Sequence, residues 1–302
     1  MIRAAVPILL AAALGGGCGM AAERGCFTKR SAVVLPERTR VLANVTNGAA
    51  GRAVAEAILD GEVDEAAALL ARDPRLIGTI VTHDPRLSEV PAGQFGDLLT
   101  LAVGRCDGEA MTMLLAHGMP ANGVEPGSAL ALALLADTPE LAERLLQAGA
   151  SPDPQKLDGG EDAMRGAIAF SHLGGVMTLL RHGADPRWSD AFGIDRVRLA
   201  LDAEQAEIAE LLVKHGGTLF GVAEDGSMAA HEVAAPAVAF TGPEQAAARA
   251  RLVERVKASP FGWPLPERAR VREMVAAGSW PTPEQARAGM VIARPVLAKL
   301  RD

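Results

Sequence analysis

Four stretches of this chain share one layout, repeated with a period close to 33 residues. Each begins with a residue that can cap a helix, and these are Asp97, Ser128, Asp162 and Asp195, at spacings of 31, 34 and 33. An apolar residue follows two positions later, as Leu99, Leu130, Met164 and Val197. Three positions further on is an alanine: Ala102, Ala133, Ala167 and Ala200. Such a period predicts stacked supersecondary units, because one unit alone cannot bury its apolar face.

Each unit is predicted to contain two short helices. The capping side chain satisfies free N–H groups at the start of the first helix, and the alanine lets the two helices approach closely. In the second helix the apolar spacing describes a buried stripe, as in Leu173, Val176, Leu179 and Leu180 of one unit. A leucine stands seventeen residues after each cap, at Leu114, Leu145, Leu179 and Leu212. A glycine four residues later ends the second helix in a left-handed conformation: Gly118, Gly149, Gly183 and Gly216.

These segments resemble ankyrin repeats of a divergent, bacterial type. The strongest match is residues 171–186, Ser-His-Leu-Gly-Gly-Val-Met-Thr-Leu-Leu-Arg-His-Gly-Ala-Asp-Pro, and residues 145–153 repeat its end. The Thr-Pro-Leu-His opening of the family is missing from every unit. The resemblance covers residues 48–220 and implies an all-α helical repeat solenoid of about five repeats, which binds a protein partner with its concave face and a row of finger loops.

A degenerate first unit fits in front of the four. Its apolar residues Val54, Ala57, Leu69 and Leu70 are in register, and Asp73-Pro74 stands where the glycine would fall. The missing cap is expected of a terminal repeat, whose outer face covers no neighbour. Residues 75–96 are longer than one finger needs, so we expect an insertion there, with a short strand at residues 79–82.

Residues 1–22 have the pattern of an export signal. Arg3 precedes an apolar stretch at residues 4–14 that is too short to span a bilayer. Leu14-Gly-Gly-Gly-Cys18 resembles a bacterial lipobox, in which the cysteine is lipidated, but its leucine lies one residue too far from Cys18. Both routes stay open, so we expect either a periplasmic protein or an outer-membrane-anchored lipoprotein facing the periplasm. Residues 23–47 are predicted to be a polar, loop-like arm.

The chain has three cysteines, Cys18, Cys26 and Cys106. If Cys18 is lipidated or removed, two cysteines remain in an oxidising compartment, where disulfides persist. Cys106 is placed at the exposed end of a first helix, and Cys26 lies on an arm that can reach it. We therefore predict a Cys26–Cys106 disulfide, with two free thiols as the alternative.

Charge is distributed unevenly along the chain. Residues 241–302 carry 11 Lys and Arg against 6 acids, which is 11 − 6 = +5, and the net charge of −7 leaves −7 − 5 = −12 for the remainder. The acidic array argues against nucleic acid as a partner. No segment after the signal is apolar enough to cross a membrane, so membrane contact is expected only through a lipid on Cys18, and the protein is expected to be a monomer.

The repeat pattern ends after Gly217. Residues 221–240 are predicted to be a connector, and residues 241–302 a helical tail. Helices are expected to open with a capping box at Thr241 and Glu244 and again at Thr282, with another at residues 266–277, and Pro295 is expected to interrupt or end the last. The tail could cover the apolar face of the last repeat. Alternatively it could be a partner-binding arm centred on Phe261, Trp263 and Trp280.

The sequence offers no convincing catalytic or metal site. His117, His182 and His215 directly precede the glycine that ends a repeat, and His172 fills a position that the ankyrin family shares, so all four are interpreted as structural. His83 and His231 are expected in loops, without a partner at metal-ligand spacing. No phosphate-binding glycine loop or nucleophile motif is present. We therefore expect a protein that is not an enzyme, with no catalytic residue, metal or cofactor.

The finger at residues 187–193 is the sharpest candidate for partner binding. Trp and Arg are enriched in interface hot spots, and the predicted contact residues are Arg187, Trp188, Asp190 and Phe192, with Lys156 in the preceding finger. Alternatively, Phe192 could tuck under the neighbouring finger with Trp188 shielding it. Two other functions stay open: an immunity or inhibitor protein that neutralises a toxin or hydrolase, and an enzyme or cofactor carrier. The latter would need a polar pocket between the tail and the last repeat.

Overall fold

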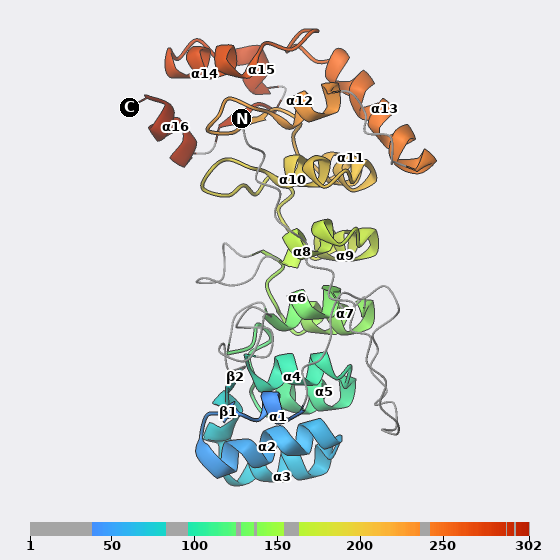
Figure 1. Ribbon diagram of the computed structural model, residues 1–302, viewed down its shortest axis with the longest axis vertical. Coiled ribbons are helices and arrows are strands. Elements are labelled where there is room, and N and C mark those ends of the chain that lie inside the picture. Colours follow the sequence, from blue (N-terminus) through green and yellow to red (C-terminus); the bar gives the residue numbers. More distant parts are fainter. Residues whose placement is uncertain are drawn as a thin grey trace.

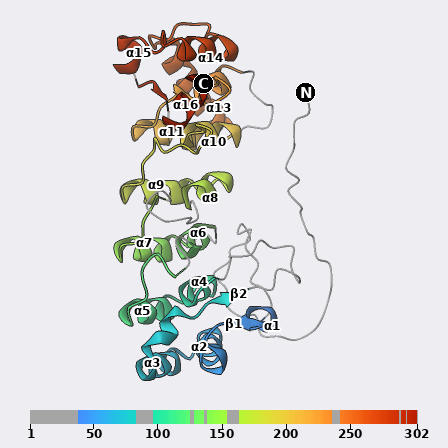
Figure 2. The same cartoon turned by 90° about the vertical axis from the view of Figure 1, so that its left-hand side faces the viewer.

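The structure is a computed structural model that describes residues 38–82, 96–124, 128–135, 138–153, 163–235, 242–287, 289–292 and 294–301. Helix pairs are stacked one above another along the long axis of the molecule, and the loops that join successive pairs project to one side (Figure 1, Figure 2). We call these loops fingers. Within the described ranges, no helix is long and apolar enough to cross a membrane.

The stack consists of first and second helices in alternation. The first helices are α2 (Gly48–Asp60), α4 (Leu98–Gly104), α6 (Ser128–Leu135), α8 (Ala163–Ala169), α10 (Arg196–Asp202) and α12 (Ala229–Ala234). The second helices are α3 (Val63–Arg72), α5 (Gly108–Ala116), α7 (Pro139–Gln147), α9 (Leu173–Arg181), α11 (Ala206–Lys214) and α13 (Pro243–Lys257). Each pair packs on the next, so one continuous apolar core runs through the molecule.

The repeated residues do what their spacing predicts. Asp97 Oδ1 accepts the N–H of Thr100, and Asp195 Oδ1 accepts the N–H of Arg198, each at 2.7 Å. Asp162 lies outside the described residues. The repeated alanines and leucines are buried: Ala102, Ala133, Ala167, Ala200, Leu114, Leu145, Leu179 and Leu212. The glycines that follow the second helices all have positive φ: Gly118, Gly149, Gly183 and Gly216. One prediction is wrong, since Leu173 is 37% exposed at the start of α9 instead of buried in its stripe.

The N-terminal end of the stack is more ordered than expected. Residues 38–47 were predicted to be loop, but α1 (Arg38–Val41) and β1 (Asn44–Val45) form there, and Val41 and Leu42 are buried. Strand β1 pairs antiparallel with β2 (Val81–Thr82), which confirms the strand predicted within residues 79–82. A 3₁₀ helix (Pro74–Gly78) leads from α3 into β2. The chain before the array therefore covers the first helix pair with its own apolar residues.

Residues 221–240, predicted to be a connector, contain a further first helix. Helix α12 packs on α10, and α13 packs on both α11 and α12. The residues of α12 and α13 that face the stack are buried, among them Ala230, Val233, Leu252 and Val256. The helix stack therefore continues past residue 220 to the end of α13. His231, predicted in a loop, lies on α12.

The remaining tail folds back onto this last pair. It contains α14 (Arg268–Ala276), α15 (Pro283–Arg287), β4 (Val291–Ile292) and α16 (Arg294–Arg301). Strand β4 pairs parallel with β3 (Gly221–Val222) of the last finger. The Phe261 ring stacks on Phe220, with centroids 3.7 Å apart, and lies 6.0 Å from Trp280. Phe261 and Trp280 are buried, so they pack the tail onto the array, and only Trp263 of the three aromatic residues is exposed.

The predicted helix starts in the tail can be compared one by one. Thr282 opens α15 as expected, because Thr282 Oγ1 accepts the N–H of Gln285 and Gln285 Oε1 accepts the N–H of Thr282. The capping residue Thr241 lies outside the described residues. Pro295 neither interrupts nor ends a helix. It is the second residue of α16, where its missing N–H has no helical acceptor to lose.

Candidate protein-binding surface

The finger of residues 185–195, here called the Phe192 finger, is a tight hairpin whose tip is shaped by Asp190. Ser189 and Asp195 pair across its base. Asp190 Oδ1 accepts the N–H groups of Phe192 and Ile194, at 2.9 and 3.0 Å. Gly193 closes the turn with a φ of 79°. Asp190, predicted to contact a partner, therefore has a carboxylate that holds the turn.

Phe192 is the most exposed large apolar side chain among the described residues, at 60%. The alternative in which it tucks under the neighbouring finger is therefore wrong. The Lys299 ammonium of α16 lies 5.0 Å from the ring centroid and 2.8 Å from Glu224. The ring is presented outward from a rigid turn, with the Lys299 cation over it in a cation–π contact.

A cleft of about 400 Å³ adjoins this ring. Its described lining residues come from the Phe192 finger, the next finger and α14, and they are Phe192, Ile194, Ala223, Glu224, Asp225 and Arg272. Three of these residues are apolar, two are carboxylates and one is an arginine. We call this the Phe192 cleft. It suits an anchor side chain that has an apolar stem and a positive end, since such a group would meet both kinds of lining.

Trp188 and Arg187, also predicted to contact a partner, are directed elsewhere. Trp188 is half-buried, and the guanidinium carbon of the buried Arg196 lies 5.5 Å from its ring centroid. Arg187 is exposed, but its Nε donates to the carbonyl of Gly216 at 2.9 Å, at the end of the next helix pair. Neither side chain belongs to the Phe192 cleft. Of the four predicted contacts in this finger, only Phe192 lines the Phe192 cleft, and Arg187 lines a separate pocket beside the tail.

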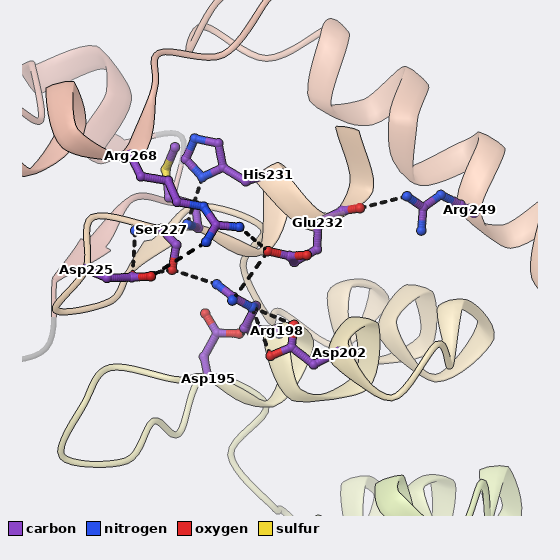
Figure 3. A network of polar contacts seen from close by, with 10 residues as sticks. Asp195, Arg198, Asp202, Asp225, Ser227, His231, Glu232, Arg249 and Arg268 are labelled. Atoms are coloured by element: carbon purple, nitrogen blue, oxygen red, sulfur yellow. Dashed lines mark hydrogen bonds and ion pairs between the residues drawn. The ribbon is translucent and has the colours of Figure 1, made fainter. Parts of the chain in front are cut away.

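A network of charged groups holds the last finger and the tail in place beside the cleft (Figure 3). Arg198 Nε donates to Asp202 at 2.8 Å, and its Nη1 donates to the Ser227 hydroxyl at 2.6 Å. The Glu232 carboxylate accepts a hydrogen bond from Arg268 Nη2 at 2.6 Å, and it also lies 3.3 Å from Arg198 Nη2. The network thus ties α10 to α12 and to α14.

Two further residues complete this network. His231 Nδ1 accepts the N–H of Met228 at the start of α12, and its Nε2 donates to the carbonyl of Pro266 at 2.9 Å. Arg249 Nη2 donates to carbonyl groups at the end of α12, including that of Glu232 at 2.7 Å. Burial raises the pKa of Asp202, although Arg198 opposes the rise. The charged groups of this network bond to one another, so we interpret the network as structural.

Asp195 is a cap whose second carboxylate oxygen is buried and has no hydrogen-bond partner among the described residues. In Asp97 that oxygen accepts the N–H of Val124 in the next finger, at 2.6 Å. Val222 stands at the same distance after Asp195, yet Asp195 Oδ2 has no hydrogen-bond partner. Burial raises the pKa of Asp195 to about 7, against an ordinary value of 3.8, with the N–H of Arg198 opposing the rise.

Several predicted site residues lie outside the described part of the chain. These are Lys156, Cys18 and Cys26, and His83, which was not expected to be a ligand, also lies outside it. Cys106, which follows α4 with a φ of 58°, is disulfide-bonded. Because neither other cysteine is described, its pairing with Cys26 stays a prediction.

The described histidines that precede the repeat-ending glycines make contacts within the array. Nδ1 of His117 and of His215 lies 3.0 and 2.9 Å from the carbonyl oxygen four residues earlier. His182 Nε2 lies 2.9 Å from Glu143 of the preceding second helix, and this contact lowers the pKa of Glu143. Among the described residues, no group of three or more His, Cys, Asp or Glu is placed to hold a metal ion.

The sequence interpretation missed two features of the surface. The first is a set of three exposed apolar side chains in the fourth helix pair and its turn: Phe170, Leu173 and Met177. Its spacing was hidden in the general apolar pattern of α9. The second is a polar pocket between the tail and the array, lined by three arginines. Their convergence depends on how the tail folds back, which no local pattern encodes.

Comparison with known proteins bears on the fold. No protein-family model matches the chain, and no curated protein matches it. The ankyrin repeat domain of Bcl-3, described as a unique member of the IkappaB family, is similar over 83% of this chain and 98% of its own, with 19% identity and a TM-score of 0.51. The human ASB11 ankyrin repeat domain is similar over 68% of this chain and 84% of its own, with 15% identity and a TM-score of 0.45. With its stacked helix pairs and projecting fingers, the chain has the fold of an all-α ankyrin-type repeat solenoid.

Proposed function

We propose that this chain is a non-enzymatic protein-interaction module that binds a protein partner through the Phe192 finger and the Phe192 cleft. The observation that carries the proposal is the 60% exposure of Phe192 on a turn fixed by Asp190. Loops held on a rigid scaffold are where binding residues concentrate. An exposed aromatic ring in such a place is a common anchor of an interface.

The cleft indicates the chemistry of the partner. Glu224 and Asp225 line it beside apolar Ile194 and Ala223. A partner segment that carries an apolar side chain followed by Lys or Arg would fill the cleft, and its cation would share Glu224 with Lys299 and Asp225 with Arg268. The acidic array, at −12 outside residues 241–302, would also attract a basic partner over distance.

Photo-crosslinking at the finger tests this proposal. A photoreactive phenylalanine analogue at position 192 should give a discrete protein adduct in the native host, and the same analogue at position 170 should not. Phe170 is a matched control, because it is also an exposed phenylalanine, at 48%, but lies at the turn between α8 and α9. Phe192→Ala should weaken capture of the identified partner by about tenfold or more, and unchanged affinity would contradict the proposal.

We further propose that the protein is exported to the periplasm, either free or held at the outer membrane by a lipid on Cys18. The support is the signal pattern of residues 1–22, which lie outside the described residues. Intact mass of the protein from its native envelope tests this. A lipid-modified Cys18 would support the anchored form, a cleaved unmodified chain the free form, and an uncleaved chain would overturn export.

A further inference from the structure

The pocket that separates the array from the tail has an unusual concentration of positive charge. It has a volume of about 360 Å³, within the usual range for small-molecule sites. Three arginines from separate segments line it: Arg187 from the base of the Phe192 finger, Arg255 from α13 and Arg287 from α15. None of its described lining residues is a carboxylate. Three positive charges therefore face one small volume without a neutralising group.

These arginines differ from many of the other arginines that the structure describes. Arg38, Arg198, Arg251 and Arg268 each form an ion pair with a carboxylate. Arg187, Arg255 and Arg287 form none with the described residues. Arg187 and Arg287 each use Nε to donate to a backbone carbonyl, of Gly216 at 2.9 Å and of Pro283 at 3.1 Å. This contact fixes the direction of each side chain and leaves the Nη groups available to a ligand.

The other lining residues suit an organic molecule more than a bare ion. The buried side chains of Leu219, Phe220 and Met290 form an apolar part of the lining. A ligand with a compact organic body and one strongly anionic end would match both parts of the pocket.

The two walls of the pocket are already joined. Thr218 Oγ1, on the array side, donates to the carbonyl of Gly289, on the tail side, at 2.7 Å. Strands β3 and β4 pair directly beside this contact. A ligand would therefore enter a preformed site, which lowers the cost of ordering it.

We propose that this pocket, here called the arginine pocket, binds a small organic phosphate whose phosphate group is held by Arg187, Arg255 and Arg287. The planar guanidinium group pairs with phosphate oxygens through two parallel hydrogen bonds. A doubly charged phosphate would also relieve the mutual repulsion of the three cations. The pocket is separate from the Phe192 cleft. A failed test of phosphate binding would therefore not contradict the proposed protein partner, and a failed test of the partner would not contradict phosphate binding.

Calorimetric titration of the full chain with glycerol 3-phosphate and with inorganic phosphate tests the proposal, in chloride buffer at matched ionic strength. We expect saturable binding of glycerol 3-phosphate. Arg255→Gln and Arg287→Gln should each raise Kd by about tenfold, because each removes a charged hydrogen-bonding partner. The control is Arg251→Gln, one turn before Arg255 on α13, whose guanidinium pairs with Glu210 at 2.6 Å. It should leave Kd unchanged.

The outcomes that overturn the proposal are the absence of both saturable glycerol 3-phosphate binding and flotation with phosphatidic acid vesicles, or equal weakening by Arg251→Gln. Circular dichroism of each variant checks that weaker binding is not caused by unfolding. A phosphate ligand could be a free metabolite or a lipid headgroup. Flotation with phosphatidic acid vesicles, compared with phosphatidylcholine vesicles, separates the two sources. If the protein floats only with phosphatidic acid vesicles, and Arg255→Gln and Arg287→Gln abolish this flotation, the pocket binds a lipid headgroup. If the protein binds glycerol 3-phosphate but floats with neither kind of vesicle, the pocket binds a free metabolite.

Discussion

Asp153 and Arg196 form an ion pair in which each side chain is only 1% exposed, with Nη1 and Oδ1 2.9 Å apart. Asp153 also accepts the N–H of Asp185, and Arg196 donates to the carbonyl of Asp185 at 2.7 Å. The pair therefore joins the ends of the third and fourth helix pairs to the start of the fifth. The half-buried Trp188 ring lies against the same guanidinium.

Arg196→Met should destabilise the array strongly. The substitution leaves the buried Asp153 carboxylate without its cation, and breaking a buried pair in this way costs about 3–5 kcal/mol. Urea unfolding followed by circular dichroism measures the change. The double variant with Asp153→Asn should recover part of the loss, because no buried charge is then left uncompensated. A loss below about 1 kcal/mol would show that water reaches Asp153.

The stability of the protein should depend on the ionisation of Asp195. Its folded pKa of about 7 exceeds the ordinary value of 3.8 because of burial. The native state therefore holds this proton more tightly than the unfolded state, and the stabilisation is complete below about pH 4 and lost as the pH rises through 7.

Asp195→Asn isolates this effect, because asparagine keeps an oxygen that can accept the N–H of Arg198 but cannot ionise. Between pH 5 and pH 8, the free energy of unfolding of the variant should rise relative to the wild type by more than about 1 kcal/mol. Urea titrations of both proteins at each pH give the difference, which removes the contribution of other titrating groups. A difference that stays constant across this range would contradict the raised pKa.

Two glycine substitutions should have opposite effects on stability. Gly149 has a φ of 97° with open space around it, so Gly149→Ala introduces backbone strain alone and should cost about 1–2 kcal/mol. Gly174 lies in the first turn of α9, and an added Cβ there also meets open space. Gly174→Ala should therefore stabilise the protein by about 0.5–1 kcal/mol. Thermal unfolding compares the two, and a shared sign would contradict the backbone explanation.

The predicted Cys26–Cys106 disulfide can be tested by alkylation and peptide mapping. Cys106 should stay unlabelled without reductant in the wild type. Cys26→Ser should make the Cys106 thiol reactive, whereas Cys18→Ser should not. Labelling of Cys106 in the unreduced wild type, or its protection in Cys26→Ser, would rule out this pairing.

The repeat periodicity predicted most of the fold, because every helix pair meets its neighbours in the same way. Asp97, Ala133, Leu179 and Gly216 each perform a role fixed within their own unit. The sequence did not predict the pair α12 and α13, because its residues depart from the repeat pattern. Met228 stands before α12 in place of an Asp or Ser cap, and Ala258 in place of a glycine follows α13, so the position of the pair depends on long-range contacts such as that between Glu232 and Arg198.

The candidate surface was predictable only in part. Trp188, Asp190, Phe192 and Arg187 were correctly placed in one finger, but their directions depend on partners far away in sequence. The carbonyl of Gly216 turns Arg187 toward the tail, and the buried Arg196 holds Trp188. A pattern of residue types identifies a finger, while the packing of the next repeat decides which of its side chains reach solvent.

The parallel pairing of β3 with β4 brings residue 221 beside residue 291. Contacts in a repeat stack are otherwise made between neighbouring units, so the earlier helix pairs can pack in turn without waiting for the C-terminal part of the chain. The finger that contains β3 reaches its final contacts only when β4, some seventy residues later in the chain, is in place. Until then the C-terminal end of the array has an uncovered strand edge and an uncovered Phe220, and both features favour aggregation.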